Sequence, residues 1–435
     1  MIISNHRPIS KLSPLSKIIE KLIKFRLVSF LAESNILSPY QFGFQRGLST
    51  QDAVLYLTEK IYDALNRSLS AIGIFIDFSK AFDTLNKEIL VKKLRCYGIK
   101  GRALRLLSSY LYDRWQLVKI GDSYSSPRQC KLGVPQGSVL GPVLFLIYVN
   151  EIPNISTEFF ACLFADDTSL LFSGNNHDTL TNLCNRGLND FYEWSCANRL
   201  SINISKTNLM LFSNSKDIKA NINLSDIQLN HSSVEHVSSV RFLGVEMDDN
   251  LKFNLQINNI ATYISKNTGV LRKLKDFVSA DTLLQLYYTF IETYMNYCTL
   301  SFGGAYETHL KTLEVAQRKC VRVVGNQSYF SHTNPIFSCL KILKFKDIYK
   351  YNLGIYMYKN LENFTIRSSL HNYETRSRDS YDTLFQRLTL TRRQSLEFKG
   401  PENWNSIPLY IKVAPSLDIF KKRYKEYLVS LYDID

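Results

Sequence analysis

Two apolar patterns alternate over the first 250 residues of the chain. Apolar residues repeated every three or four positions indicate helices, whereas short continuous apolar runs bounded by turn residues indicate buried strands. The first helical pattern begins at Ser13-Pro14, an N-cap residue followed by a first-turn proline. Further helical patterns cover roughly 50–68, 87–96, 101–113 and 178–198. Strand-like runs occupy 71–76, 159–164, 169–172, 209–212 and 240–247.

Three of these segments predict more local structure. Residues 116–132 alternate in polarity, which predicts a β-hairpin that turns at Gly121-Asp122. Residues 159–172 predict a second hairpin, with acidic residues at its tip. Pro135–Ser138 opens an apolar helix.

The pattern changes near residue 250, beyond which only helical periodicity remains. One predicted helix carries a stripe made of Leu310, Leu313, Gln317, Cys320 and Val324, and Arg318, Lys319 and Arg322 lie off that stripe. The chain therefore predicts an α+β body, an antiparallel sheet with helices, followed by a helical part. We expect divisions at 1–250, 251–340 and 341–435, the last of them basic.

Composition adds a class of partner. The 435 residues are 45% hydrophobic, which suits a globular chain of two or three domains. Lysine and arginine number 53 against 39 acidic residues, a net charge of +14. This excess favours a polyanionic partner, with nucleic acid first and an anionic membrane surface second. A basic protein without such a partner is the alternative.

The cysteines and the apolar stretches exclude two further classes. None of the eight cysteines forms a C-x-x-C pair, so we expect no zinc site and reduced thiols in an intracellular protein. The longest apolar stretch, Val139–Val149, is too short to cross a bilayer.

Two acidic patches carry the candidate chemistry. Asp77 ends one strand-like run, and Asp166 and Asp167 lie at the tip of a predicted hairpin. Either patch alone is typical of a turn or a helix cap. Clustered carboxylates repel one another, and bound Mg²⁺ removes that repulsion. Two divalent ions that clamp attacking and leaving oxygens catalyse nucleotidyl transfer, provided that the patches meet.

Seven sequence blocks follow one another along the first 250 residues: Arg7-Pro-Ile-Ser10, Gln41-Phe-Gly-Phe44, Phe75–Asp83, Pro135–Pro142, Phe164-Ala-Asp-Asp167, Asn203-Ile-Ser-Lys-Thr207 and Arg241-Phe-Leu-Gly244. In this order they resemble the reverse transcriptases, and in particular those of jockey-like non-LTR retrotransposons. The resemblance extends weakly to the C-terminus, where Phe398–Pro408 is similar to a signature of these elements.

The resemblance implies a right-hand polymerase: fingers and palm over 1–250, a helical thumb over 251–340 and a basic extension over 341–435. It implies that Asp77 and Asp166 bind two Mg²⁺ ions, or Mn²⁺ instead, with Asp167 as a third carboxylate beside them. Lys206 would reach the departing pyrophosphate. A surface lysine remains an equal alternative for Lys206.

The resemblance also implies residues that bind the substrates. Arg7 would hold triphosphate oxygens, with a structural ion pair as the alternative. Phe82 would exclude a 2′-hydroxyl from the incoming sugar, although an aromatic side chain in this position could simply be core. Gln136 and Gly137 would lie against the nascent base pair. Phe242, Leu243 and Gly244 would grip the primer end.

The expected function is RNA-directed DNA polymerisation inside the cell, in cytoplasm and nucleus, on an RNA template with a DNA primer and dNTPs. No protein partner is identified. The chain starts four residues before Asn5, where the family carries an endonuclease domain and further fingers residues. We therefore expect a truncated copy. A nucleic-acid-binding relic without catalysis is the main alternative, and a metal-dependent nuclease is a weaker one.

Overall fold

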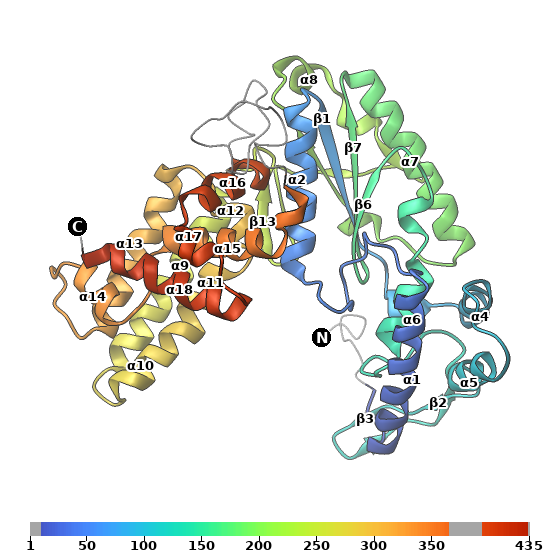
Figure 1. Cartoon of the computed structure of the whole chain (residues 1–435). Coiled ribbons are helices and arrows are strands. Elements are labelled where there is room, and N and C mark those ends of the chain that lie inside the picture. The colour runs from blue at the N-terminus through green and yellow to red at the C-terminus, as the bar shows by residue number, and fades with distance from the viewer. Residues whose placement is uncertain (1–9, 365–393, 434–435) are drawn as a thin grey trace. The chain divides into compact units, whose positions relative to one another are not determined.

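The computed structural model describes residues 10–364 and 394–433, which divide into two compact units (Figure 1). The first unit comprises Met1–Ala53 and Leu69–Val237. The second unit comprises Val54–Ser68 and Ser238–Asp435. Helix α2 (Thr50–Asn66) therefore begins in one unit and continues in the other.

A five-stranded sheet forms the centre of the first unit. The strand order is β11-β8-β1-β7-β6, in which β1 pairs antiparallel with both β7 and β8. Every residue of β1 is buried, as expected for a continuous apolar run in a central strand. The strands are β1 (Ser70–Ile76), β6 (Phe160–Phe164), β7 (Asp167–Gly174), β8 (Asn208–Phe212) and β11 (Glu235–His236).

Helices enclose this sheet in one apolar core. Helix α6 has buried residues on all its sides, which matches its wholly apolar sequence. Helix α7 packs against β7 and β1. The helices of this unit other than α2 are α1 (Pro14–Glu33), α3 (Ala81–Thr84), α4 (Lys87–Cys96), α5 (Gly101–Leu111), α6 (Gly141–Val149), α7 (His177–Ala197) and α8 (Lys216–Asn221). Short 3-10 helices are η2 (Ile152–Asn154), η3 (Ile204–Lys206) and η4 (Leu224–Asp226).

The predicted hairpin at 116–132 is present as two short ladders. The inner ladder pairs β3 with β4 through Ile120 and Ser123, so the turn lies at Gly121-Asp122 as predicted. These strands are β2 (Trp115–Gln116), β3 (Lys119–Ile120), β4 (Ser123–Tyr124) and β5 (Arg128–Gln129). A separate pair is formed by β9 (Gln228–Leu229) and β10 (Ser232–Ser233).

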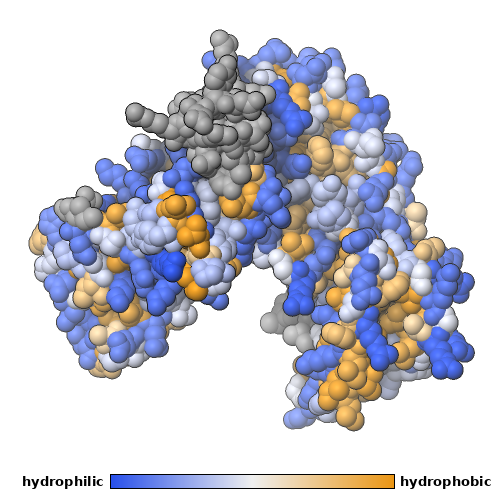
Figure 2. Space-filling model, viewed as in Figure 1, coloured by the Kyte–Doolittle hydropathy of each residue, from blue (hydrophilic) through white to orange (hydrophobic). Residues whose placement is uncertain are grey.

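Helix α1 begins where the sequence predicts. The Oγ atom of Ser13 accepts a hydrogen bond from the Ser16 N–H at 3.2 Å. The apolar face that indicated the helix is exposed, whereas Leu27 and Leu31 are buried further along. Figure 2 shows apolar residues gathered over this part of the first unit. The exposed apolar residues of α1 are Leu15, Ile18, Ile19, Leu22 and Phe25.

The single strand predicted at 240–247 is wrong. The chain instead forms a hairpin of β12 (Ser239–Phe242) and β13 (Val245–Asp248), in which Phe242 pairs with Val245. The two residues between the strands, Leu243 and Gly244, have φ values of 45° and 85°. Such left-handed pairs make the tight turns that fit the twist of a hairpin. A leucine gives no turn signal, which explains the error.

The remainder of the second unit is helical, as predicted. Helices α9 and α13 pack together, and the stripe from Leu310 to Val324 on α13 is buried. The helices are α9 (Asn254–Leu274), α10 (Ala280–Tyr287), α11 (Thr293–Asn296), α12 (Thr299–Phe302), α13 (Glu307–Val324), α14 (Asn334–Cys339), α15 (Phe345–Lys359), α16 (Leu396–Ser406), α17 (Leu409–Lys412) and α18 (Leu417–Ser430). The described residues of this unit also form a π-helical turn, η5 (Tyr288–Glu292), and two 3-10 helices, η6 (Leu361–Asn363) and η9 (Leu431–Asp433).

These elements confirm the α+β class. In the described part of the chain no helix is long and apolar enough to cross a membrane. All eight cysteines are free thiols, and Cys162 is buried as its apolar strand predicts. The functional divisions at 250 and 340 stay predictions.

A buried carboxyl group makes the second unit sensitive to pH. The backbone N–H of Leu396 donates to Oε1 of Glu59 at 2.9 Å. The pKa of Glu59 is raised from 4.5 to about 7, chiefly by burial, which outweighs the lowering by the hydrogen bond from Leu396; the nearby Glu397 also raises it. Because the folded pKa is raised, the stability that Glu59 contributes is complete below its unfolded pKa and is lost as pH rises through 7.

We therefore expect Glu59→Gln to reduce the loss of stability between pH 5 and pH 8. Relative to that of the unchanged chain, the free energy of unfolding of Glu59→Gln should be larger at pH 8 than at pH 5 by roughly 1–3 kcal/mol. Urea unfolding of the full chain across this range measures it, with the exposed Glu426→Gln as control. Some pH dependence should remain, since burial also raises the pKa of Glu292. If the free energy of unfolding of Glu59→Gln and of Glu426→Gln changed equally with pH, the raised pKa assigned to Glu59 would be wrong.

Candidate active site

The sheet brings the two acidic patches together. Ile76, the last residue of β1, pairs with Thr168 of β7. Asp77 directly follows β1, and Asp167 is the first residue of β7. Because the two strands are antiparallel neighbours, both aspartates lie at the same edge of the sheet. Phe164 pairs with Asp167, so Asp166 lies in the two-residue turn of that hairpin. The side chain of Asp77 is 39% exposed, which leaves it accessible.

The acidic turn is held in an unfavourable backbone conformation. Ala165 has a φ of 57°, which costs an alanine roughly 1–2 kcal/mol. The buried side chain of Gln41 compensates, because its Oε1 accepts hydrogen bonds from the Ala165 N–H at 3.0 Å and the Gly43 N–H at 2.8 Å. Phe42 N–H donates to the Leu163 carbonyl at 2.7 Å on the same hairpin. The Gln41–Gly43 segment therefore fixes the position of Asp166.

A second set of contacts surrounds Asp77. Asn203 donates from its backbone N–H to the Asp77 carbonyl at 2.8 Å and from Nδ2 to Oδ2 at 3.1 Å. The Lys206 Nζ atom lies 4.0 Å from the same Oδ2. The side chain of Lys206 is 70% exposed, so it remains able to reach a ligand. Lys206 therefore belongs to the aspartate cluster, whatever its role.

Phe82 and Gln136 lie on adjoining segments near this edge. The ring of Phe82 is half-buried and stacks on Phe145 of α6, with 4.5 Å between centroids. The Val134 N–H donates to the Phe82 carbonyl at 3.0 Å. The Gln136 Nε2 donates to Asp83 Oδ2 at 2.8 Å, which gives Asp83 a structural contact. Gly137 is exposed with a φ of 94°.

A buried carboxylate anchors the Gln136 loop to α1. Oε2 of Glu20, which is 2% exposed, accepts from the Val139 N–H at 2.6 Å and the Leu140 N–H at 3.2 Å. These N–H groups precede the first turn of α6, where a negative charge is favourable. Glu20 therefore holds the loop that carries Gln136 and Gly137.

The remaining predicted residues lie elsewhere. Phe242, Leu243 and Gly244 belong to the second unit, where the Tyr297 hydroxyl donates to the Leu243 carbonyl at 2.5 Å. This contact stabilises a left-handed leucine, a conformation that costs about 1 kcal/mol or more. Arg7 lies outside the described residues.

The carboxylates suit a cation that is only partly bound by protein. Among the described residues, no three His, Cys, Asp or Glu side chains are grouped so as to hold a metal ion. Mg²⁺ in phosphoryl-transfer sites typically takes only one or two carboxylates and completes its shell with water and substrate phosphates. Asp77 and Asp166 as ligands of such an ion stay a prediction.

The sequence of this part of the chain matches a known family. The sequence pattern of the family described as reverse transcriptase (RNA-dependent DNA polymerase) matches residues 3–247. Because the match covers more than half of the chain and includes every residue of the cluster, the chain belongs to the reverse transcriptase family.

Two of the similar proteins are named as RNA-directed DNA polymerases of mobile elements. A probable RNA-directed DNA polymerase from transposon BS of Drosophila melanogaster is 30% identical over 75% of this chain. The RNA-directed DNA polymerase from mobile element jockey of Drosophila funebris is 27% identical over 79% of it. The chain spans 37% and 38% of the length of these two relatives.

Among solved structures, telomerase from Candida albicans in complex with a fragment of telomeric RNA matches 76% of this chain and 59% of its own. The TM-score is 0.42 and the sequence identity 12%, a likeness too distant to carry a conclusion.

Sequence reasoning missed the residues that position the cluster. Gln41 and Gly43 were noticed only as a family block, and Glu20, Asn203 and Tyr297 received no role. The signal for Glu20 was a carboxylate that falls among apolar residues of a helix. Contacts of this kind join distant segments, so a local pattern does not reveal the partner.

Gly43 offers a test of the acidic turn. A Cβ atom at Gly43 would lie 2.4 Å from the Ala165 backbone nitrogen, so the hairpin would have to move. We expect Gly43→Ala to destabilise the hairpin by about 1–3 kcal/mol. Hydrogen exchange of amides in 160–174 should accelerate accordingly. Gly269→Ala, on a helix with open space around it, is the control and should change nothing there. Unchanged exchange in Gly43→Ala would refute the tight contact.

Proposed function

We propose that this chain is the polymerase portion of a non-LTR retrotransposon enzyme and adds dNTPs to a DNA primer on an RNA template. The observation that carries the proposal is the strand register that ends β1 and β7 together, with Asp77, Asp166 and Asp167 at one edge. Membership of the reverse transcriptase family supports it. The net charge of +14 suits nucleic acid.

In this proposal Asp77 and Asp166 hold two Mg²⁺ ions, with Mn²⁺ as an alternative. When bound, the ions would lower the pKa of the primer 3′-hydroxyl and offset charge on the transferring phosphate. Asp167 supplies a further negative charge beside them. Asn203 positions Asp77 through one hydrogen bond to its carboxylate and one to its backbone carbonyl.

Lys206 acts in this scheme as a positive charge for the departing pyrophosphate. Its Nζ lies 4.0 Å from Asp77 Oδ2, and its exposed side chain is free to swing towards a phosphate. A variant that keeps the positive charge but does not give up a proton would show whether Lys206 also donates a proton.

Phe82, Gln136 and Gly137 form the proposed nucleotide contacts. The stacking of Phe82 on Phe145 fixes the plane of its ring, as a steric gate requires. The exposed backbone of Gly137 permits close approach of a base pair. Arg7 is proposed for the triphosphate, and Phe242–Gly244 for the primer end. Helices of 251–340 would hold the duplex through its phosphates, whereas 341–435 receives no role beyond its charge.

Primer extension tests the proposal. Purified chain should extend a DNA primer on an RNA template with dNTPs and Mg²⁺. Asp77→Asn and Asp166→Asn should each lower the rate roughly 1,000-fold or more, because each removes a metal ligand. Asp178→Asn changes an exposed aspartate at the start of α7 and should leave the rate unchanged.

Two results would contradict polymerase activity. Extension that persists in both cluster variants would remove the aspartates from the mechanism. Absence of extension by the unchanged chain, with duplex binding preserved, would favour a nucleic-acid-binding protein without catalysis.

The sugar gate has its own test. Phe82→Ala should lower discrimination between dNTPs and ribonucleotides at least tenfold, because the clash with the 2′-hydroxyl disappears. The ratio of kcat/KM values for the two substrates measures this. Phe82→Tyr retains the ring and should keep the discrimination. An unchanged ratio in Phe82→Ala would assign the ring to the core alone.

A further inference from the structure

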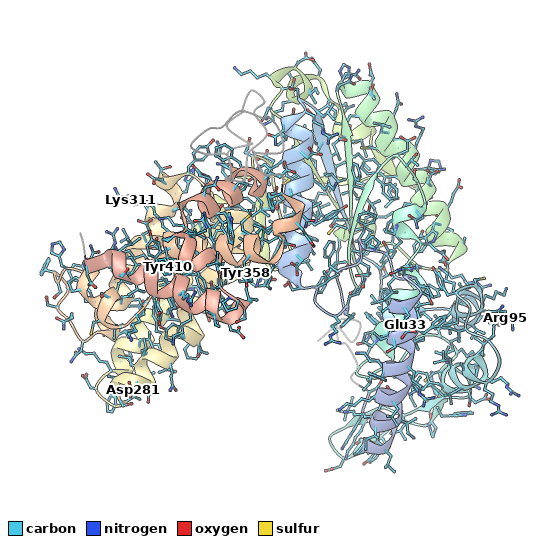
Figure 3. All side chains as sticks on the ribbon, viewed as in Figure 1. Glu33, Arg95, Asp281, Lys311, Tyr358 and Tyr410 are labelled. Carbon is cyan, nitrogen blue, oxygen red and sulfur yellow. The ribbon has the colours of Figure 1, made fainter. Side chains whose placement is uncertain are left out.

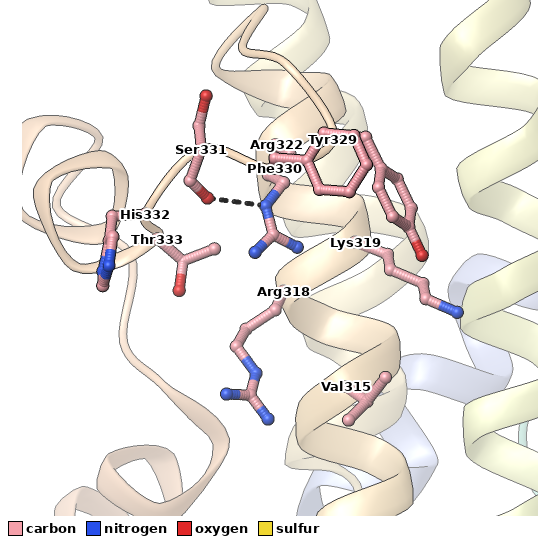
Figure 4. Close-up of a pocket in the computed structure, with 9 residues that line it drawn as sticks. All are labelled: Val315, Arg318, Lys319, Arg322, Tyr329, Phe330, Ser331, His332 and Thr333. Atoms are coloured by element: carbon pink, nitrogen blue, oxygen red, sulfur yellow. Dashed lines mark hydrogen bonds between the residues drawn. The ribbon is translucent and has the colours of Figure 1, made fainter.

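A pocket of about 430 Å³ lies in the second unit, between helix α13 and the segment 329–333 (Figure 4). Pockets that bind small ligands usually measure roughly 300–1,000 Å³, so this one has room for a nucleotide. None of the residues of the aspartate cluster lines it. It is therefore a separate feature of the chain.

Three cations line the pocket. Arg318 and Arg322 are one helical turn apart on α13 and so share a face, and Lys319 follows Arg318. Figure 4 shows the guanidinium groups of both arginines beside the segment 329–333. Within the described residues, no carboxylate lies at ion-pair distance from these three side chains. The pocket therefore has positive charge without internal compensation.

The acidic residues of α13 are engaged elsewhere. Lys346 Nζ lies 3.1 Å from Glu307 and 3.5 Å from Glu314. Among the described residues, Arg322 donates through Nε alone, to the Ser331 carbonyl at 2.8 Å. Its terminal N–H groups remain for a ligand, because a guanidinium has five donors in all.

Two aromatic rings lie exposed at the rim of the pocket. Phe330 is 89% exposed and Tyr329 61%, and their centroids are 5.3 Å apart in an edge-to-face arrangement. Exposing an entire phenylalanine ring to water forgoes roughly 1.5–3 kcal/mol of burial. Such a ring beside uncompensated cations is typical of proteins that bind single-stranded nucleic acid, where bases stack on aromatic side chains.

The segment that carries the rings has a defined conformation. Asn326 has a φ of 50° directly after α13, and the Gln327 N–H donates to the Arg322 carbonyl at 2.9 Å. The Ser328 and Ser331 hydroxyls are hydrogen-bonded at 2.9 Å. The rings are therefore presented by a structured turn, which lowers the entropic cost of binding.

We propose that this pocket binds a nucleotide of single-stranded RNA, with its phosphate between Arg318 and Arg322 and its base on Phe330. Bases within a duplex already stack on one another and are not available to such a ring. The site thus goes beyond the proposed polymerase reaction, since it would hold an unpaired stretch of RNA outside the duplex. It does not depend on Asp77 or Asp166.

Fluorescence anisotropy with a labelled oligouridylate and, separately, a labelled RNA–DNA duplex tests the proposal. Phe330→Ala should weaken binding of the single strand about 5- to 100-fold, and should leave duplex affinity within about twofold. Arg318→Ala should weaken single-strand binding and lower its salt slope by about 0.7. Both changes are at the surface, and circular dichroism would verify folding.

Matched controls come from the same unit. Phe277→Ala removes a ring that is 85% exposed, and Lys311→Ala removes an exposed cation of α13 that does not itself line the pocket (Figure 3). Neither control should change single-strand affinity more than about twofold. Phe330→Trp provides a direct reading, since base stacking on the indole should quench its fluorescence when oligouridylate is added.

Three results would overturn the proposal. The first is oligouridylate binding by Phe330→Ala that is as tight as that of the unchanged chain. The second is an equal loss of single-strand and duplex affinity in Phe330→Ala, which would make the pocket an ordinary duplex contact. Indole fluorescence unaltered by saturating oligouridylate would exclude stacking at this position.

Discussion

The antiparallel register between β1 and β7 is the constraint on which the rest of the candidate site depends. Ile76 faces Thr168, and this pairing alone decides that acidic residues from two distant segments end at the same edge. A shift of one residue would send alternate side chains to the opposite face of the sheet. The apolar residues of both strands, buried in one core, prevent that shift.

Polar contacts then position what the register has brought together. Gln41 holds the turn at Ala165, Asn203 holds Asp77, and Glu20 holds the loop of Gln136. Gln41 and Glu20 accept from backbone N–H groups of another segment, and Asn203 donates to the Asp77 carboxylate. Preorganisation of this kind is what a site needs to bind ions and phosphates without rearrangement.

The sequence was informative where a local pattern decides the structure. Asp77 and Asp166 follow apolar strands, and the N-cap at Ser13 and the turn at Gly121 carry direct signals. Local patterns failed where a distant partner decides. Leu243 adopts a left-handed turn that its side chain does not favour, since Tyr297, 54 residues later, binds its carbonyl. Gln41 likewise acts 124 residues away from its own position.

The buried carboxylate of Glu20 has a consequence for how related sequences should be read. The presence of the aspartates does not by itself show that the loop of Gln136 is still held in place. In this chain, a residue at position 20 without a side-chain acceptor would leave two N–H groups before α6 unpaired, while every aspartate stayed in place. An inventory of defective copies based on the acidic positions alone would therefore miss inactivation at supporting positions.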